Sequence, residues 1–160
     1  MKEYCCGKLE FEGEYLNGER NGKGKEYGWR GNLEFEGEFK NGKRHGQGKG
    51  FNEYGNIIFE GEYLYGNKRK GKSYINEIFE FEGEYLYNRK YNGKGFDEKG
   101  NIIYELKNGN GKVKEYDDYG YLIYEGEYKN GKRYYIWSRI FILKTIKWKI
   151  LYNNNWKEYI

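Results

Sequence analysis

The chain has 160 residues and a formal net charge of +4, with 34% charged and 21% aromatic residues. That length fits one domain or one repeat array. Aliphatic residues are too sparse for a conventional core of Leu, Val and Ile, so any apolar face must consist mostly of Tyr and Phe. Cys5 and Cys6 are the only cysteines and His45 is the only histidine, a set that offers neither a disulfide framework nor a zinc site.

The first residues already belong to a repeat. Lys2-Glu3-Tyr4 matches Lys25-Glu26-Tyr27 further along the chain. The chain therefore begins in the middle of a repeat unit, and Cys5 and Cys6 fall in a connecting turn.

Residues 9–15 read Leu-Glu-Phe-Glu-Gly-Glu-Tyr and alternate with a period of two. The alternation predicts a β-strand with its apolar residues on one face and its three glutamates on the other. Asn17-Gly18 supplies the positive φ angles of a tight hairpin turn, and residues 22–27 form a Lys-rich second strand. We expect its lysines to face the glutamates of the first strand across the ladder.

The same pattern recurs at intervals of 20 to 24 residues, and Gly-Asn turns such as Gly31-Asn32 separate the units. The units start at Phe11, Phe35, Phe59, Phe81, Tyr104 and Tyr124. The apolar residues that precede these anchors, Leu9, Leu33, Ile57, Phe79 and Leu122, are expected to share the face of the anchors. The sequence predicts an all-β fold over residues 1–133, an elongated single-layer antiparallel sheet of about six tandem β-hairpins. Residues 134–160 form an atypical basic and aromatic C-terminal tail.

The order aromatic-Glu-Gly-Glu-aromatic, then Asn-Gly, then Gly-x-Gly resembles the MORN repeat (membrane occupation and recognition nexus). The units that start at Phe11 and Phe35 carry all three parts. The unit at Tyr104 lacks Gly-Glu-Tyr, and the unit at Phe59 lacks one glycine of Gly-x-Gly. The resemblance covers residues 2–133 and implies a β-hairpin array used in protein assembly, sometimes beside membranes, with no catalysis by the repeats.

A single sheet has no second layer to cover its aromatic face. The rings pack against one another, with glycines making room, or stay available to a partner, or serve both purposes by lining a curved groove. From the second role we predict a non-catalytic scaffold that binds a protein partner through this face, or a second copy through unpaired terminal strands. The candidate contacts are Phe11, Tyr15, Phe35, Phe39, Phe59, Tyr63, Phe81, Tyr85, Tyr124 and Tyr128.

A rival hypothesis is a peripheral membrane module that binds anionic phospholipids through basic hairpin tips and the tail. Residues 129–160 carry eight Lys and Arg and one acidic residue, a balance that favours an anionic partner. The candidate lipid contacts are Lys43, Arg44, Lys68, Arg69, Lys70, Lys132, Arg133, Lys147 and Lys149. The resemblance also implies a third hypothesis, an antitoxin-like neutralising role, because related repeats occur in such bacterial proteins.

Nucleic acid is not expected as a partner, because glutamates alternate with the lysines along the repeat. The chain opens without a basic and then apolar leader, so we expect a cytoplasmic protein, peripheral to a membrane under the lipid hypothesis.

The tail supports one more hypothesis, drawn from the genetic code. Lys147-Trp148-Lys149 is encoded by AAR-TGG-AAR, and reading from the next base gives Asn/Ser-Gly-Lys/Arg, the hairpin phrase of the repeat. Residues 137–142 can likewise be read as a Gly-Val/Ala-Glu-Tyr-Leu-Tyr strand. The tail is then a frameshifted continuation of the array, and repeat-like codons in the shifted frame of the gene would test this.

Residues 66–73, Gly-Asn-Lys-Arg-Lys-Gly-Lys-Ser, match the G-x-x-x-x-G-K-[ST] phosphate loop. That loop needs a helix N-terminus behind it, whereas this match aligns with residues 41–48 of the previous unit. We therefore predict a hairpin connection, with Ser73 in the place of Gly48 and Gly95, and no nucleotide. The paired glutamates recur in most units and point outward, so no catalytic residue, metal or cofactor is expected and the chain is not predicted to be an enzyme.

Overall fold

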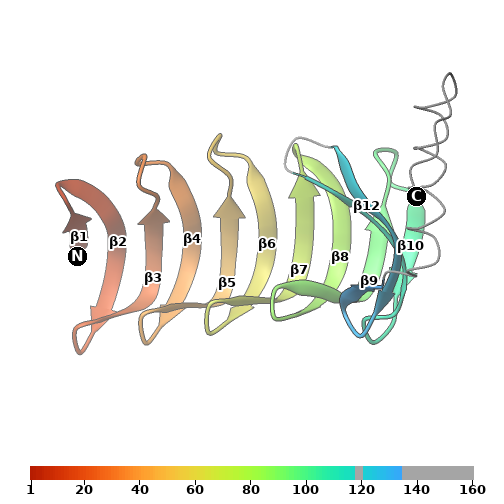
Figure 1. Ribbon diagram of the computed structural model, residues 1–160. Coiled ribbons are helices and arrows are strands. Elements are labelled where there is room, and N and C mark those ends of the chain that lie inside the picture. The colour runs from red at the N-terminus through yellow and green to blue at the C-terminus, as the bar shows by residue number, and fades with distance from the viewer. Residues whose placement is uncertain (118–120, 135–160) are drawn as a thin grey trace, which may run out of the picture.

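The computed structural model describes residues 1–117 and 121–134, which form thirteen β-strands. The strands are β1 (Lys2–Cys5), β2 (Lys8–Leu16), β3 (Glu19–Tyr27), β4 (Leu33–Lys40), β5 (Lys43–Phe51), β6 (Ile57–Leu64), β7 (Asn67–Ile75), β8 (Ile78–Leu86), β9 (Arg89–Phe96), β10 (Ile102–Leu106), β11 (Gly111–Tyr116), β12 (Leu122–Lys129) and β13 (Lys132–Tyr134). Strands β1 to β10 form one antiparallel sheet in chain order, and β11 to β13 form a second (Figure 1). The prediction of an all-β, open array of consecutive hairpins is confirmed.

The ten-stranded sheet ends in the unit that departs from the repeat. Strand β10 has five residues, because this unit lacks the Gly-Glu-Tyr of the others. Val113 of β11 takes the register position that Gly24 holds in the first unit. Leu106 and Val113 are both buried, and β11 pairs with β12 instead of β10. The division of the array into two sheets thus falls in the unit where apolar residues replace the glycines.

A β-bulge near the start of β2, β4, β6, β8 and β12 changes which face of the sheet the first side chains of the strand occupy. Glu3 pairs with Phe11, but the next pair is Tyr4 with Leu9, so Glu10 is an extra residue. The same shift precedes Phe35, Phe59, Phe81 and Tyr124. Because side chains alternate along a strand, one extra residue sends Leu9 to the face opposite Phe11. The prediction that Leu9, Leu33, Ile57, Phe79 and Leu122 share the face of the anchors is therefore wrong.

The core is a row of interlocked rings along one face of the sheet. Phe11, Phe35, Phe59 and Phe81 are fully buried. In the first three units each anchor contacts an aromatic residue of its own strand and one of the next unit edge to face, with ring centroids 4.9 to 5.5 Å apart. Phe81 meets Tyr85 of its own strand edge to face at 5.6 Å and stacks on Tyr104 at 6.2 Å. Such geometry suits the charge distribution of aromatic rings.

Glycines provide the floor under these rings. A Cβ atom added to Gly24 would lie 2.6 Å from the Cε2 atom of Phe11, well inside van der Waals contact. Gly37 and Gly48 lie under Phe35 in the same way. The glycines of the repeat thus allow a single layer of β-sheet to bury large rings.

No helix among the described residues is long and apolar enough to cross a membrane.

Candidate interaction surface

Basic side chains from the hairpin tips cover the aromatic row. Arg20 lies 4.5 Å above the ring of Phe11, and Arg44 lies 4.8 Å above Phe35. Glu26 joins both guanidinium groups, at 3.2 Å from Arg20 and 2.7 Å from Arg44. Similar cation–ring pairs are Lys68 with Phe59, Lys90 with Phe81 and Arg133 with Tyr124. Cation–π contacts and ion pairs together close the open side of the row.

The predicted partner-binding face is therefore the core. Of its ten residues, eight are buried, and Tyr15 and Tyr124 are partly buried. Burial raises the pKa of Tyr63 to about 12. Of the two roles that the sequence left open, packing among the rings is the one that the structure has. The prediction that these rings are an exposed surface is wrong, because sequence alternation gives no sign of the basic cover.

Several predicted lipid contacts belong to the same layer. Arg44, Lys68 and Arg133 lie over rings, and Arg133 also lies 2.7 Å from Glu115. Arg69 pairs with Glu62 at 2.5 Å, and Lys70 lies in register with Glu62 and Glu84. Lys43 and Lys132 are exposed. Lys147 and Lys149, like the predicted frameshifted tail, lie outside the described residues.

The phosphate-loop match folds as the turn before β7 and most of that strand. Ser73 pairs with Phe59 as Gly50 pairs with Phe35, so its counterpart is Gly50 and not Gly48, because this unit has one residue fewer after its turn. The hydroxyl of Ser73 donates to Glu80 at 3.1 Å. Lys90 and Tyr104 also donate to the buried carboxylate of Glu80. Ser73 is thus part of a buried polar cluster at the end of the core.

The opposite face of the ten-stranded sheet carries a row of alternating charges, which we call the charge ladder. It consists of Lys2, Glu12, Lys25, Glu36, Lys49, Glu60, Lys72, Glu82, Lys94 and Glu105, one from each strand from β1 to β10. The prediction that lysines face glutamates across the strands is confirmed. Lys25 lies 3.4 Å from Glu36 and Lys49 lies 3.6 Å from Glu60. About half of each of these lysine side chains remains exposed.

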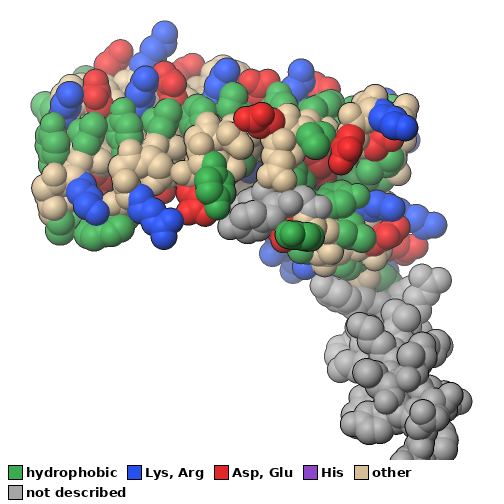
Figure 2. Space-filling view, turned by 90° about the horizontal axis from the view of Figure 1, so that it is seen from above, with side chains coloured by type: hydrophobic (Ala, Val, Ile, Leu, Met, Phe, Trp, Pro, Cys, Tyr) green, Lys and Arg blue, Asp and Glu red, His purple; other side chains and the backbone are tan. Residues whose placement is uncertain are grey.

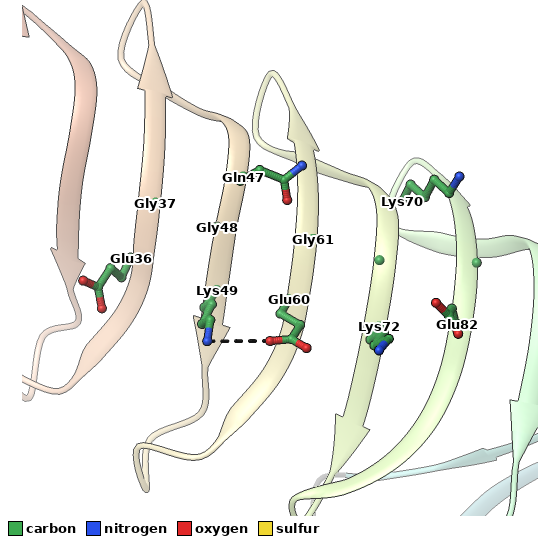
Figure 3. A pocket seen from close by; sticks show the side chains of 12 residues that line it. Glu36, Gly37, Gln47, Gly48, Lys49, Glu60, Gly61, Lys70, Lys72 and Glu82 are labelled. Atoms are coloured by element: carbon green, nitrogen blue, oxygen red, sulfur yellow. Dashed lines mark ion pairs between the residues drawn. The ribbon is translucent and has the colours of Figure 1, made fainter. Parts of the chain in front are cut away.

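A long groove runs over this ladder. One part, of about 670 Å³, spans β4 to β8 and is lined by ladder residues and the backbone of glycines such as Gly48 and Gly61 (Figure 3). A second part, of about 550 Å³, spans β2 to β5 and shares Glu36, Gly37 and Gln47 with the first. The groove therefore crosses seven consecutive strands.

Half-buried apolar side chains lie beyond the bulges of the strands that carry the ladder. They are Tyr27, Leu33, Phe51, Ile57, Tyr74, Phe79 and Phe96, which we call the apolar ridge. Phe79 and Phe96 stack at 4.6 Å, and Lys72 of the ladder lies 5.7 Å from the ring of Phe79. In Figure 2, hydrophobic side chains follow one another along the array between basic and acidic side chains. The sequence did not reveal the ridge, because the bulges that turn Leu33 and its counterparts to this face have no mark of their own in the sequence.

One hydrogen bond joins ridge and ladder directly. The hydroxyl of Tyr74 donates to Glu60 at 2.6 Å. This bond, with the charges of Lys49 and Lys72, holds the pKa of Glu60 below its usual range. Burial, together with the same bond, raises the pKa of Tyr74 to about 12. The surface therefore combines fixed charges with apolar area.

A comparison with known protein families matches the MORN repeat at residues 11–28, 35–49 and 124–133. These segments include β12 beyond the division of the sheet, so the repeat resumes there. A comparison with curated proteins found no match.

Proposed function

We propose that this chain, which is a MORN-repeat protein, is a non-catalytic scaffold that binds a protein partner along the charge ladder and the apolar ridge. MORN repeats in general are protein and membrane interaction modules, and the repeat itself is not an enzyme. One observation carries the proposal: a groove over the ladder crosses seven strands, and Tyr74 and Phe79 of the ridge contact its charges Glu60 and Lys72. The aromatic row is buried, so a partner cannot reach it in the same way.

The chemistry of the groove defines the partner. The ladder has equal numbers of Lys and Glu, so it offers local charge complementarity without attracting one sign over a distance. Glycine backbone forms the floor of the groove, and the ridge supplies the apolar area on which affinity depends. The partner is therefore a segment with both acidic and basic side chains and at least one aromatic or aliphatic anchor.

The lipid hypothesis has weaker support. Arg44 and Lys68, two of its basic contacts, lie against rings of the core instead of pointing away from the tips. A membrane surface also prefers clustered positive charge, whereas the ladder alternates. For these reasons the scaffold is preferred.

A peptide-display selection against the purified chain tests this proposal. Selected peptides would be measured for affinity by fluorescence anisotropy against two charge-swap variants. The groove variant exchanges the ladder pair, Lys25→Glu with Glu36→Lys. The control exchanges a pair between two turns, Arg30→Glu with Glu53→Arg, which lies 2.9 Å apart and away from the groove. Both variants keep the net charge and one exposed ion pair.

We expect the groove variant to lose roughly tenfold in affinity, because a reversed pair places like charges against the partner, while the control binds as the wild type does. Equal affinity of the groove variant would contradict the proposed site. Binding of the protein to vesicles rich in phosphatidylserine, and not to neutral vesicles, with no peptide selected, would favour the lipid hypothesis instead.

A further inference from the structure

Two neighbouring thiols lie on the surface at the turn between β1 and β2. Cys5 is the last residue of β1 and Cys6 follows it, and both are exposed. The Sγ atom of Cys5 donates to the Sγ atom of Cys6 at 3.8 Å. The turn therefore holds both sulfur atoms side by side and open to solvent.

The backbone at Cys6 is unusual for a cysteine. Cys6 has φ 52° and Gly7 has φ 78°, the pair of left-handed residues that a type I′ hairpin turn requires. Asn17, Asn41 and Asn130 take the same position in other turns, with φ between 50° and 53°. Asparagine tolerates this region because its short polar side chain can bond to the backbone nearby. The geometry of the turn therefore does not explain why a cysteine stands at position 6.

Hydrogen bonding and acidic neighbours surround the Cys5 thiol. The hydrogen bond with Cys6, followed by burial and the charges of Glu10 and Glu3, raises the pKa of Cys5. Lys8 closes the turn, but its Nζ atom donates to the carbonyl oxygen of Trp29 at 3.0 Å. Within residues 1–117 and 121–134, no group of three or more His, Cys, Asp or Glu is placed to hold a metal ion. A suitable ligand must therefore accept two thiols and require no third protein ligand.

We propose that Cys5 and Cys6 form a bidentate binding site for trivalent arsenic, in the form of a monosubstituted arsenoxide. In the reaction each sulfur forms one As–S bond. The As=O double bond of the arsenoxide breaks, and its oxygen leaves as one water molecule with the two thiol protons. No atom changes its oxidation state, so no oxidant or reductant is needed.

Phenylarsine oxide is the probe for this site. Intact-mass measurement under non-denaturing conditions should show one adduct per chain, formed with loss of water. Because both sulfur atoms belong to one turn, the second As–S bond forms intramolecularly, and we expect it to strengthen binding roughly a hundredfold over one thiol. The wild-type adduct should therefore persist in excess glutathione and be released by the dithiol dimercaprol.

Two variants, Cys5→Ser and Cys6→Ser, provide the comparison. Both positions are exposed, so neither change disturbs the core, and far-UV circular dichroism verifies the fold. Each variant should lose its adduct to glutathione. Retention of the adduct by either variant under glutathione, or its loss from the wild type, would overturn the proposal. Peptide binding at the groove does not depend on this result.

Discussion

Substitution of Gly37 by alanine tests whether the glycine row sets the spacing of the sheet. Its Cβ atom would lie 2.5 Å from the carbonyl oxygen of Gln47 and 2.5 Å from the Cα atom of Gly48, both backbone atoms of β5. The Cζ atom of Phe35 would be 2.8 Å away. Neither strand can move without disturbing its backbone hydrogen bonds, so the variant must separate β4 from β5 or displace the ring of Phe35.

The expected size of the effect follows from two opposing terms. Alanine in a strand interior is normally favoured over glycine by about 0.5–1 kcal/mol. Forcing a methyl group into a filled site costs about 1–3 kcal/mol, and more when backbone must move. Because backbone must move here, the cost lies near the upper end of that range, and after the gain is subtracted we expect Gly37→Ala to lower the free energy of unfolding by about 2 kcal/mol.

Urea unfolding followed by circular dichroism measures this difference. Gly28→Ala is the matched control, because the Cβ atom there would meet only side-chain ends, with the Cδ atom of Glu34 2.9 Å and the Oδ1 atom of Asn32 3.0 Å away, and no backbone atom of a neighbouring strand. The control should be neutral or slightly stabilised. Equal stability of Gly37→Ala and Gly28→Ala would refute the role of the glycine row.

A second glycine separates backbone from ring contacts. At Gly48 the near atoms belong to Phe35, with Cε2 at 2.5 Å, while the nearest backbone oxygen is 3.2 Å away. Phe35→Leu should therefore rescue part of the loss in Gly48→Ala but little of that in Gly37→Ala. Equal rescue at both positions would show that the ring, and not the strand spacing, is the constraint.

Three further predictions concern the polar groups of the fold. Arg44→Met should destabilise the protein by about 1–2 kcal/mol by removing a cation over Phe35 and a donor to Glu26, while Lys43→Met at the exposed neighbouring position changes stability by less than about 0.5 kcal/mol in the same urea assay. Lys90→Met leaves the carboxylate of Glu80 buried without its cation, so we expect the free energy of unfolding to fall by about 3–5 kcal/mol. A second change, Glu80→Gln, should recover part of this loss. An unchanged free energy of unfolding in Lys90→Met would contradict the role of this pair. The folded-state pKa of Glu60 is lowered, so the contribution of Glu60 to stability is present at neutral pH and is lost as the pH falls below about 4.5. Tyr74→Phe should raise the pKa of Glu60 in an NMR titration. An unchanged pKa would show that the hydrogen bond from Tyr74 does not hold it down.

The repeat and the charge pattern could be predicted from the amino-acid sequence. The phrase around Phe11 recurs with its turns, and alternation with a period of two places each Glu12-type residue opposite a Lys25-type residue. These are local properties, because a strand of seven residues and a two-residue turn need no distant contact to be recognised. For the same reason the sequence was sufficient to place the phosphate-loop match in a hairpin instead of before a helix.

Only the tertiary structure decided which face is covered. The bulge at Glu10 moves Leu9 to the ladder face, and one such residue reverses every side chain beyond it. Arg20 pairs with Tyr15 beyond a register shift and lies over Phe11, a contact that depends on how the two strands pair and not on spacing in the sequence. The residues that looked exposed are therefore the core. The apolar ridge beside the charge ladder, which local alternation had assigned to the other face, is the surface left for a partner.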